Sequence, residues 1–318
     1  MRRFTIRAVL FVVALQPAFA QHTFSQRTPD GQPDLQGIWT NATITPFERP
    51  AALANKQSLT EEEAAALERQ SAKNRANPPP PREGDVGNDL WLEPGTKVVS
   101  TRQTSLVVDP PDGRVPLTAE AERIHAYQLA HNADSYEFMS LWDRCVTRGV
   151  PGGMFPGGSD NAYQIIQTPG YVVIVYEMIH EAHVIPLTDK HTSSARQLNG
   201  DSIGRWDGNT LVVDTINYNG HGQIATSAAT GRMKAMPETG NLHVVQRFTR
   251  LDADTIDYRV TIEDPPMYSK PWTVSLPLTR DDGYRIFEYA CHEGNQATIL
   301  ELSAGRAAEK AAIDKAAH

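Results

Sequence analysis

Apolar and polar positions alternate along much of the second half of the chain. Between residues 255 and 262 every second residue is apolar, as in Ile256-Asp257-Tyr258-Arg259-Val260. Since successive side chains of a β-strand point to opposite faces, this pattern predicts a strand with one buried and one solvated face. Half-buried strands of this kind are typical of antiparallel sheets.

Turn residues divide the alternating runs into hairpins. Four segments hold β-branched and aromatic runs around Pro-Gly, Asp-Gly or Asp-Ala-Asp turns: 163–187, 203–217, 242–263 and 272–291. Asp-Gly between such runs is among the stronger short-range signals for a hairpin. Roughly ten strands in hairpin succession predict a mainly β chain that forms an antiparallel up-and-down barrel.

Helices are expected around this barrel rather than within it. Residues with helix-capping chemistry are Thr60, with Glu63 three positions later, and Thr118, Ser135 and Ser303. They predict helices at 60–74, 118–131, 136–145 and 304–316. Four prolines at 78–81 predict an extended linker after the first helix.

These elements divide the chain into four parts. They are a leader, an arm with the entry strand and the Pro-rich linker, a barrel domain with a helical insertion at 118–145, and a C-terminal helix: 1–20, 21–100, 101–302 and 303–318.

The leader has the pattern of a secretory signal peptide. Arg2 and Arg3 open a basic region, residues 8–15 are apolar, and Ala18-Phe19-Ala20 is a small-x-small cleavage pattern. The apolar run is too short to span a bilayer, and no other run is longer. The mature protein is therefore expected to be periplasmic or secreted, without a stable membrane anchor.

Charge and cysteine content restrict the classes of function. The formal net charge is −8 and no basic cluster is present, which argues against a nucleic-acid partner. The chain has two cysteines, Cys145 and Cys291. In an oxidising compartment an isolated pair most often forms a disulfide, although two free thiols are the alternative.

Several sequence blocks resemble an uncharacterised family of secreted bacterial proteins. The blocks are DRC at 143–145, YQIIQTPGY at 163–171, EMIHE at 177–181, RWDGNTLVV at 205–213 and EYACHEGN at 288–295. The resemblance implies no particular activity. Gly37-Ile38-Trp39 is loosely similar to the entry strand of lipocalin-type barrels, which implies a lipocalin-like barrel with Trp39 at one end.

The main candidate site follows the longest apolar run outside the leader. Glu177, His180, Glu181 and His183 lie within seven positions, at the expected bend between two strands. They suit acid–base chemistry or a divalent metal, or they are solvated residues of a turn. Because their spacing matches no known zinc motif, no metal site is assigned.

Other polar residues are weaker candidates. His292 and Glu293 lie at the end of an expected strand, where they form either a rim site or a structural hydrogen-bond pair. Arg144 would stabilise negative charge on a ligand or pair with an acidic residue. Ser202 lies near His191 in the sequence, but no Gly-x-Ser-x-Gly motif accompanies it.

Aromatic residues such as Tyr176 and Trp39 are expected in the core or lining a ligand site. No Rossmann or P-loop fingerprint occurs, so no cofactor is assigned.

Together these features lead to one main hypothesis. The protein is expected to bind a small, partly apolar molecule at the barrel mouth, contacted by Tyr176, Glu181, His183, Glu293 and Trp39. If it is an enzyme, the expected chemistry is a cofactor-free lyase, isomerase or hydrolase step. The residues expected to perform it are Glu177, His180, His292 and Arg144. A non-catalytic carrier and a structural protein of the cell envelope are the alternatives.

Overall fold

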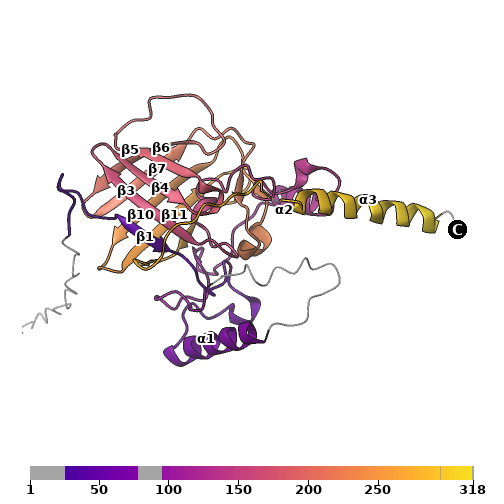
Figure 1. Ribbon diagram of the computed structural model, residues 1–318, viewed down its shortest axis with the longest axis horizontal. Coiled ribbons are helices and arrows are strands. Elements are labelled where there is room, and N and C mark those ends of the chain that lie inside the picture. The colour runs from indigo at the N-terminus through magenta and orange to yellow at the C-terminus, as the bar shows by residue number, and fades with distance from the viewer. Residues whose placement is uncertain (1–25, 78–94, 294, 317–318) are drawn as a thin grey trace, which may run out of the picture.

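A barrel of β-strands forms the centre of the molecule, with helices at its margins (Figure 1). The computed structural model describes residues 26–77, 95–293 and 295–316. The expected signal peptide lies outside the described residues, as does the Pro-rich run at 78–81. No helix in the described part of the chain has the length and apolar character that crossing a membrane requires.

Within the described residues, nine strands make up the barrel, and their order around it follows the chain. They are β1 (Gly37–Thr40), β3 (Ala162–Thr168), β4 (Tyr171–Tyr176), β5 (Ala182–Pro186), β6 (Asp201–Asp207), β7 (Thr210–Ile216), β10 (His243–Arg250), β11 (Thr255–Glu263) and β13 (Leu278–Arg280). The predicted antiparallel up-and-down barrel with peripheral helices is confirmed.

In the described part of the chain, four further short strands lie beside the barrel. β12 (Trp272–Ser275) pairs with β11 and with β2 (Val107–Asp109), whereas β8 (Gln223–Ala225) and β9 (Met236–Pro237) form a small separate sheet. They enlarge the core without changing the ring.

The barrel interior is a packed apolar core. On β11 the predicted inward positions Ile256, Tyr258, Val260 and Ile262 are all fully buried. They pack with inward residues of the other strands, such as Phe248, into one continuous cluster. Because side chains fill the middle of the barrel, a ligand site must lie at its edge.

Closure of the ring leaves a seam between β5 and β6. All eight pairings from β5 round to β6 are antiparallel. Nine strands cannot alternate in direction around a closed ring, so β5 and β6 must meet in parallel. The structure shows this as a parallel bridge between Leu187 and Gly204, where the Thr188 N–H donates to the Gly204 carbonyl at 3.0 Å.

Gly204 allows the two edges of the seam to approach at this bridge. A Cβ at this position would lie 2.9 Å from the Ile185 side chain and 3.0 Å from that of Leu187. The seam is therefore closed at the bridge, while toward the start of β5 and β6 no ladder joins the strands.

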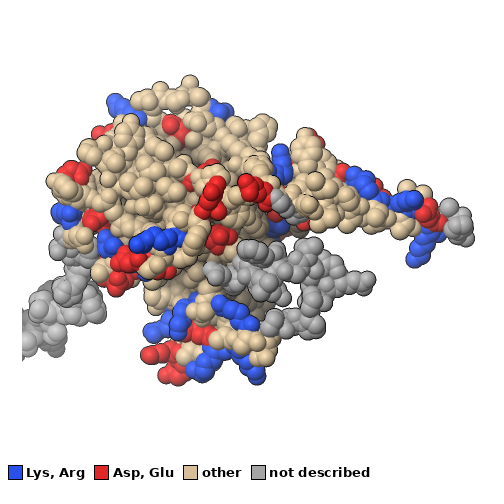
Figure 2. All heavy atoms as spheres, viewed as in Figure 1, with Lys and Arg blue, Asp and Glu red and all other residues tan. Residues whose placement is uncertain are grey.

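Helices flank the barrel on two sides (Figure 1). Thr60 caps α1 (Glu61–Ala76) in the predicted capping box, and Thr118 caps α2 (Ala119–Ala130). The C-terminal helix α3 (Ala297–Ala316) begins earlier than the predicted residue 304 and extends away from the barrel. Figure 2 shows charges of both signs over α1 and along α3, whereas the visible barrel face is mostly uncharged.

The helix predicted at 136–145 is wrong beyond its first turn. Ser135 caps a short 3-10 helix, Tyr136–Phe138, after which Met139 is extended. Met139 and Leu141 are buried, and the Leu141 N–H donates to the Gln223 side chain at 2.9 Å. Tertiary contacts therefore override the local helix preference here.

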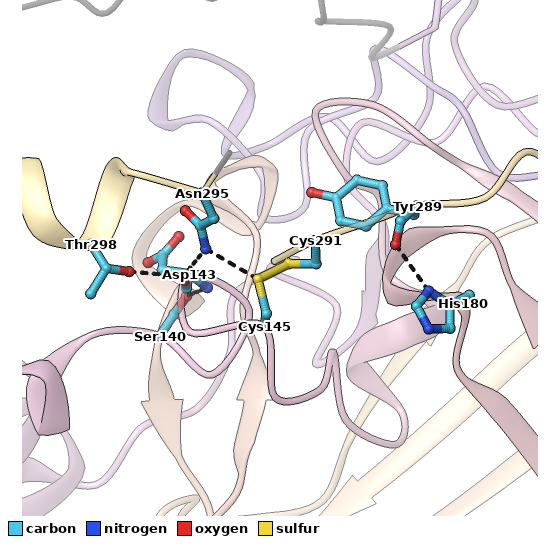
Figure 3. The surroundings of a disulfide bond; sticks show 8 residues. All are labelled: Ser140, Asp143, Cys145, His180, Tyr289, Cys291, Asn295 and Thr298. Atoms are coloured by element: carbon cyan, nitrogen blue, oxygen red, sulfur yellow. Dashed lines mark hydrogen bonds between the residues drawn. A yellow bond between two sulfur atoms is a disulfide. The ribbon is translucent and has the colours of Figure 1, made fainter. Parts of the chain in front are cut away.

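The strand predicted at 284–291 is also wrong. Residues 281–293 run as an irregular strap, because β13 already has β1 and β11 as neighbours. The predicted pair Cys145 and Cys291 is confirmed, with the two sulfur atoms 2.07 Å apart, and it anchors this strap (Figure 3). Beyond the disulfide, the Asn295 and Thr298 side chains donate to the Asp143 carbonyl at 3.2 and 3.1 Å.

Candidate functional site

The open end of the seam between β5 and β6 forms a cleft of about 250 Å³. Tyr176, Glu181 and His183 line it from the β4–β5 side, and Asn199, Asp201 and Ser202 line it from the β6 side. Three of the predicted ligand-binding residues thus come together, in a cleft whose walls are mainly polar. We refer to this cavity as the seam cleft.

A chain of side-chain contacts crosses the seam inside this cleft. His183 on β5 and Ser202 on β6 both point inward, and His183 Nε2 lies 2.8 Å from Ser202 Oγ. The other ring nitrogen, Nδ1, lies 3.4 Å from the Tyr176 hydroxyl. Ser202 Oγ also lies 2.8 Å from the hydroxyl of Thr215 on β7. One imidazole therefore links both edges of the seam.

Burial keeps the side chains that make these contacts uncharged. Desolvation lowers the pKa of His183 to about 4, so the imidazole is neutral at neutral pH. Desolvation also raises the pKa of Tyr176 well above its usual value, so its hydroxyl retains the proton. A neutral imidazole has one nitrogen that donates and one that accepts, and here each nitrogen faces a hydroxyl.

Glu181 holds the two rims of the cleft together. Its carboxylate oxygens both lie 2.7 Å from the Thr147 hydroxyl, and the Asn199 amide donates to Oε1 at 2.6 Å. The backbone N–H of Arg148 lies 3.4 Å from Oε2. Because these groups belong to three separate segments, Glu181 fixes the shape of the cleft.

Glu177 lies in a different cavity from Glu181 and His183. Ile179 and His180 adopt left-handed backbone conformations with φ of 64° and 42°, and the chain turns sharply there. Glu177 is buried and accepts from the Tyr284 hydroxyl at 2.7 Å and the Phe287 N–H at 3.0 Å. It lines a cleft of about 440 Å³ beside the strap. The bend thus divides the predicted Glu/His cluster.

The remaining predicted catalytic residues lie near the strap and its disulfide. His180 Nδ1 donates to the Tyr289 carbonyl at 2.9 Å (Figure 3). His292 is exposed in the turn that follows Cys291. The Arg144 guanidinium lies over the Tyr136 ring, 5.2 Å from its centroid. Their catalytic roles stay predictions.

Glu293 and Trp39 occupy opposite environments. Glu293 is exposed in the same turn as His292. Trp39 is fully buried, and its indole N–H donates to the Leu35 carbonyl at 2.9 Å. The guanidinium groups of Arg250 and Arg280 lie 5.1 and 5.8 Å from its ring centroid. Trp39 therefore belongs to the barrel core.

Ser202 has a different partner from the one its sequence position suggests. The sequence places it near His191, but His191 contacts Asp201 at 2.8 Å and Asp214 at 3.1 Å on the outer side of the barrel. Ser202 faces inward instead, toward His183. The sequence did contain one signal: Ser202 and Gly204 are two positions apart on one strand, so they share a face. It did not show that β5 adjoins β6.

A second polar cluster on the outer side fixes the loop between β5 and β6. Asp214 accepts from both His191 and His243, the latter at 2.6 Å. The hydrogen bond from His243 lowers the pKa of Asp214, and the same bond raises the pKa of His243. Within the described residues, no group of His, Cys, Asp and Glu side chains is arranged to hold a metal ion.

Comparisons of the chain with protein-family models, with curated proteins and with solved structures found no match.

Proposed function

We propose that the protein binds a small, largely polar molecule in the seam cleft and acts on it by cofactor-free acid–base chemistry. The 2.8 Å contact between His183 and Ser202 inside the cleft carries this proposal. A base within hydrogen-bond reach of a hydroxyl is the first geometric requirement of proton-transfer catalysis. His183 thereby replaces His180 and His292 as the candidate base.

The setting in which the protein works is part of the same proposal. The leader at 1–20 and the pairing of Cys145 with Cys291 both suit export to an oxidising compartment. The ligand would accordingly be a molecule of the periplasm or of the external medium.

A binding protein without catalysis is the second candidate. Burial lowers the pKa of His183 to about 4, which is low for a base that works near neutral pH. A neutral imidazole can instead provide one donor and one acceptor to a bound polar ligand. In that case His183 would determine affinity and specificity without any turnover.

Native mass spectrometry of the secreted protein tests whether the cleft binds a ligand. We expect a retained small molecule on the wild type that is lost from His183→Asn. His221→Asn is the matched control, because His221 is exposed. Retention of the molecule by His183→Asn at the wild-type level would place the ligand elsewhere.

A further inference from the structure

We propose that Ser202 is the nucleophile of an acyl-transfer site, with His183 as its base, and that the substrates are small carboxylic esters. This inference rests on the proposed function and names its reaction and substrate class. An activated serine needs a base within about 2.6–3.2 Å and an opening through which the acyl group can reach it. The pair of Ser202 and His183 has the first, at 2.8 Å, and the seam cleft provides the second.

The hydrogen-bond chain fixes where the protons must lie. For Ser202 to donate to Nε2 of His183, the ring proton must be on Nδ1, which then faces the Tyr176 hydroxyl at 3.4 Å. Thr215 can then donate its own hydroxyl proton to Ser202 Oγ across 2.8 Å. Tyr176 and Thr215 are therefore positioning residues, one for the tautomer of the imidazole and one for the rotamer of the serine.

The reaction balances without a cofactor. Ser202 Oγ forms a bond to the acyl carbon while its proton moves to His183 Nε2. The bond between that carbon and the ester oxygen then breaks, and the leaving alcohol takes the proton from His183. Water, deprotonated by the same nitrogen, attacks the acyl-serine, and Ser202 leaves with its proton restored. One ester and one water give one acid and one alcohol.

The cleft sets the size and polarity of the substrate. A volume of about 250 Å³ lies below the usual range of about 300–1,000 Å³ for sites that hold drug-sized ligands. Polar groups of Gln197 and Asn199 line its rim. Short acyl groups such as acetyl fit this description better than long aliphatic chains.

A fluorophosphonate probe tests the nucleophile directly. Such probes form a covalent bond to an activated serine with loss of fluoride, and peptide mapping locates the label. We expect wild-type protein to be labelled at Ser202 and p-nitrophenyl acetate to be hydrolysed. Because the mapping uses wild-type protein, it does not depend on whether a variant folds. A label on another serine, or no label, would overturn the assignment.

Variants separate this inference from the proposed function. Ser202→Ala should lower kcat/KM for p-nitrophenyl acetate at least ~100-fold, as should His183→Asn. Ser193→Ala is the matched control, since Ser193 is exposed on the neighbouring loop. Loss of activity in His183→Asn but not in Ser202→Ala would overturn the nucleophile and keep the base. Full activity in both variants would overturn the base as well.

Discussion

Neighbouring strands are joined differently in two regions of the barrel. One region is the seam between β5 and β6, and the other is the wall formed by β7, β10 and β11. In the wall, β10 pairs with β11 over eight consecutive residues, from His243 opposite Glu263 to Arg250 opposite Ile256. At the seam the backbones of the two strands are joined at one bridge. Elsewhere a hydrogen bond between the side chains of His183 and Ser202 connects the strands in place of a ladder. Mainly apolar side chains such as Val244 and Phe248 fill the inner face of β10 and β11, whereas the seam places an imidazole and a serine hydroxyl there. The region with the weakest backbone pairing is thus also the region whose inward side chains suit acid–base chemistry.

Truncation of a wall residue should have the largest effect on stability. Phe248 on β10 is fully buried, and its ring centroid lies 4.8 Å from that of Tyr258. Phe248→Ala should lower the free energy of unfolding by about 4 kcal/mol, because it leaves a cavity in a packed core. Urea denaturation measures this. Leu187→Ala, at the half-buried seam, is the comparison, and an equal loss there would mean that the seam is as tightly packed as the wall.

The acid sensitivity of the fold should come from the seam. Folded His183 takes a proton only near pH 4, whereas in the unfolded chain it does so near 6.5. Between these values the unfolded state binds more protons, so stability falls as pH drops from 6.5 toward 4 and levels off below. The loss amounts to roughly 3 kcal/mol. Urea denaturation of His183→Gln across this range should show a flatter pH profile, and an unchanged profile would contradict the assignment.

A methyl group at the bridge of the seam should have an intermediate effect. In Gly204→Ala the new Cβ would lie 2.9 Å from the Ile185 side chain and 3.0 Å from that of Leu187, so these packed side chains must shift. Overpacking of this kind costs about 1–3 kcal/mol. Thermal unfolding checks it against Gly283→Ala, whose Cβ would meet only an Asp281 oxygen at 3.6 Å. Equal melting temperatures for the two variants would show that the seam is loose.

The outer cluster on the wall should give the smallest effect, with the opposite sign of pH dependence. The pKa of His243 is raised by its bond to Asp214, so this pair stabilises the fold below pH 6.5 and loses that contribution as pH rises through the folded pKa. The pKa of Asp214 is lowered by the same bond, so its contribution is lost only in acid. Since both groups are half-exposed, His243→Gln should cost under about 1 kcal/mol near pH 6 and less at pH 9.

Local patterns predicted the wall better than the seam. Alternation at Ile256, Tyr258, Val260 and Ile262 identified the buried face of β11, because a strand paired along both edges keeps its pleat and directs every second side chain into the barrel. The turn residues Asp281-Asp282-Gly283, followed by an aromatic run, misled at 284–291. There the decisive contacts are the bonds from Tyr284 and Phe287 to Glu177 and the disulfide at Cys291, all of them distant in sequence.

The candidate site could be predicted only in part, for a related reason. Tyr176, Glu181 and His183 are close in sequence, and a polar cluster at a strand end was visible there. Their partner Ser202 was not, because its position depends on which strands meet when the ring closes. Glu177 was grouped with them by sequence distance, but the left-handed turn at Ile179 and His180 directs it into another cavity.

The odd number of strands in the barrel fixes one feature of the ring. A ring of antiparallel neighbours with nine members must contain one mismatch in direction, wherever that mismatch is placed. Substitutions can bring β5 and β6 closer together, and a circular permutation can move the chain termini, but neither change removes the mismatch. Removing it, however, requires a strand to be gained or lost. A parallel junction between β5 and β6 therefore persists through any substitution of the surrounding residues, whichever side chains line it.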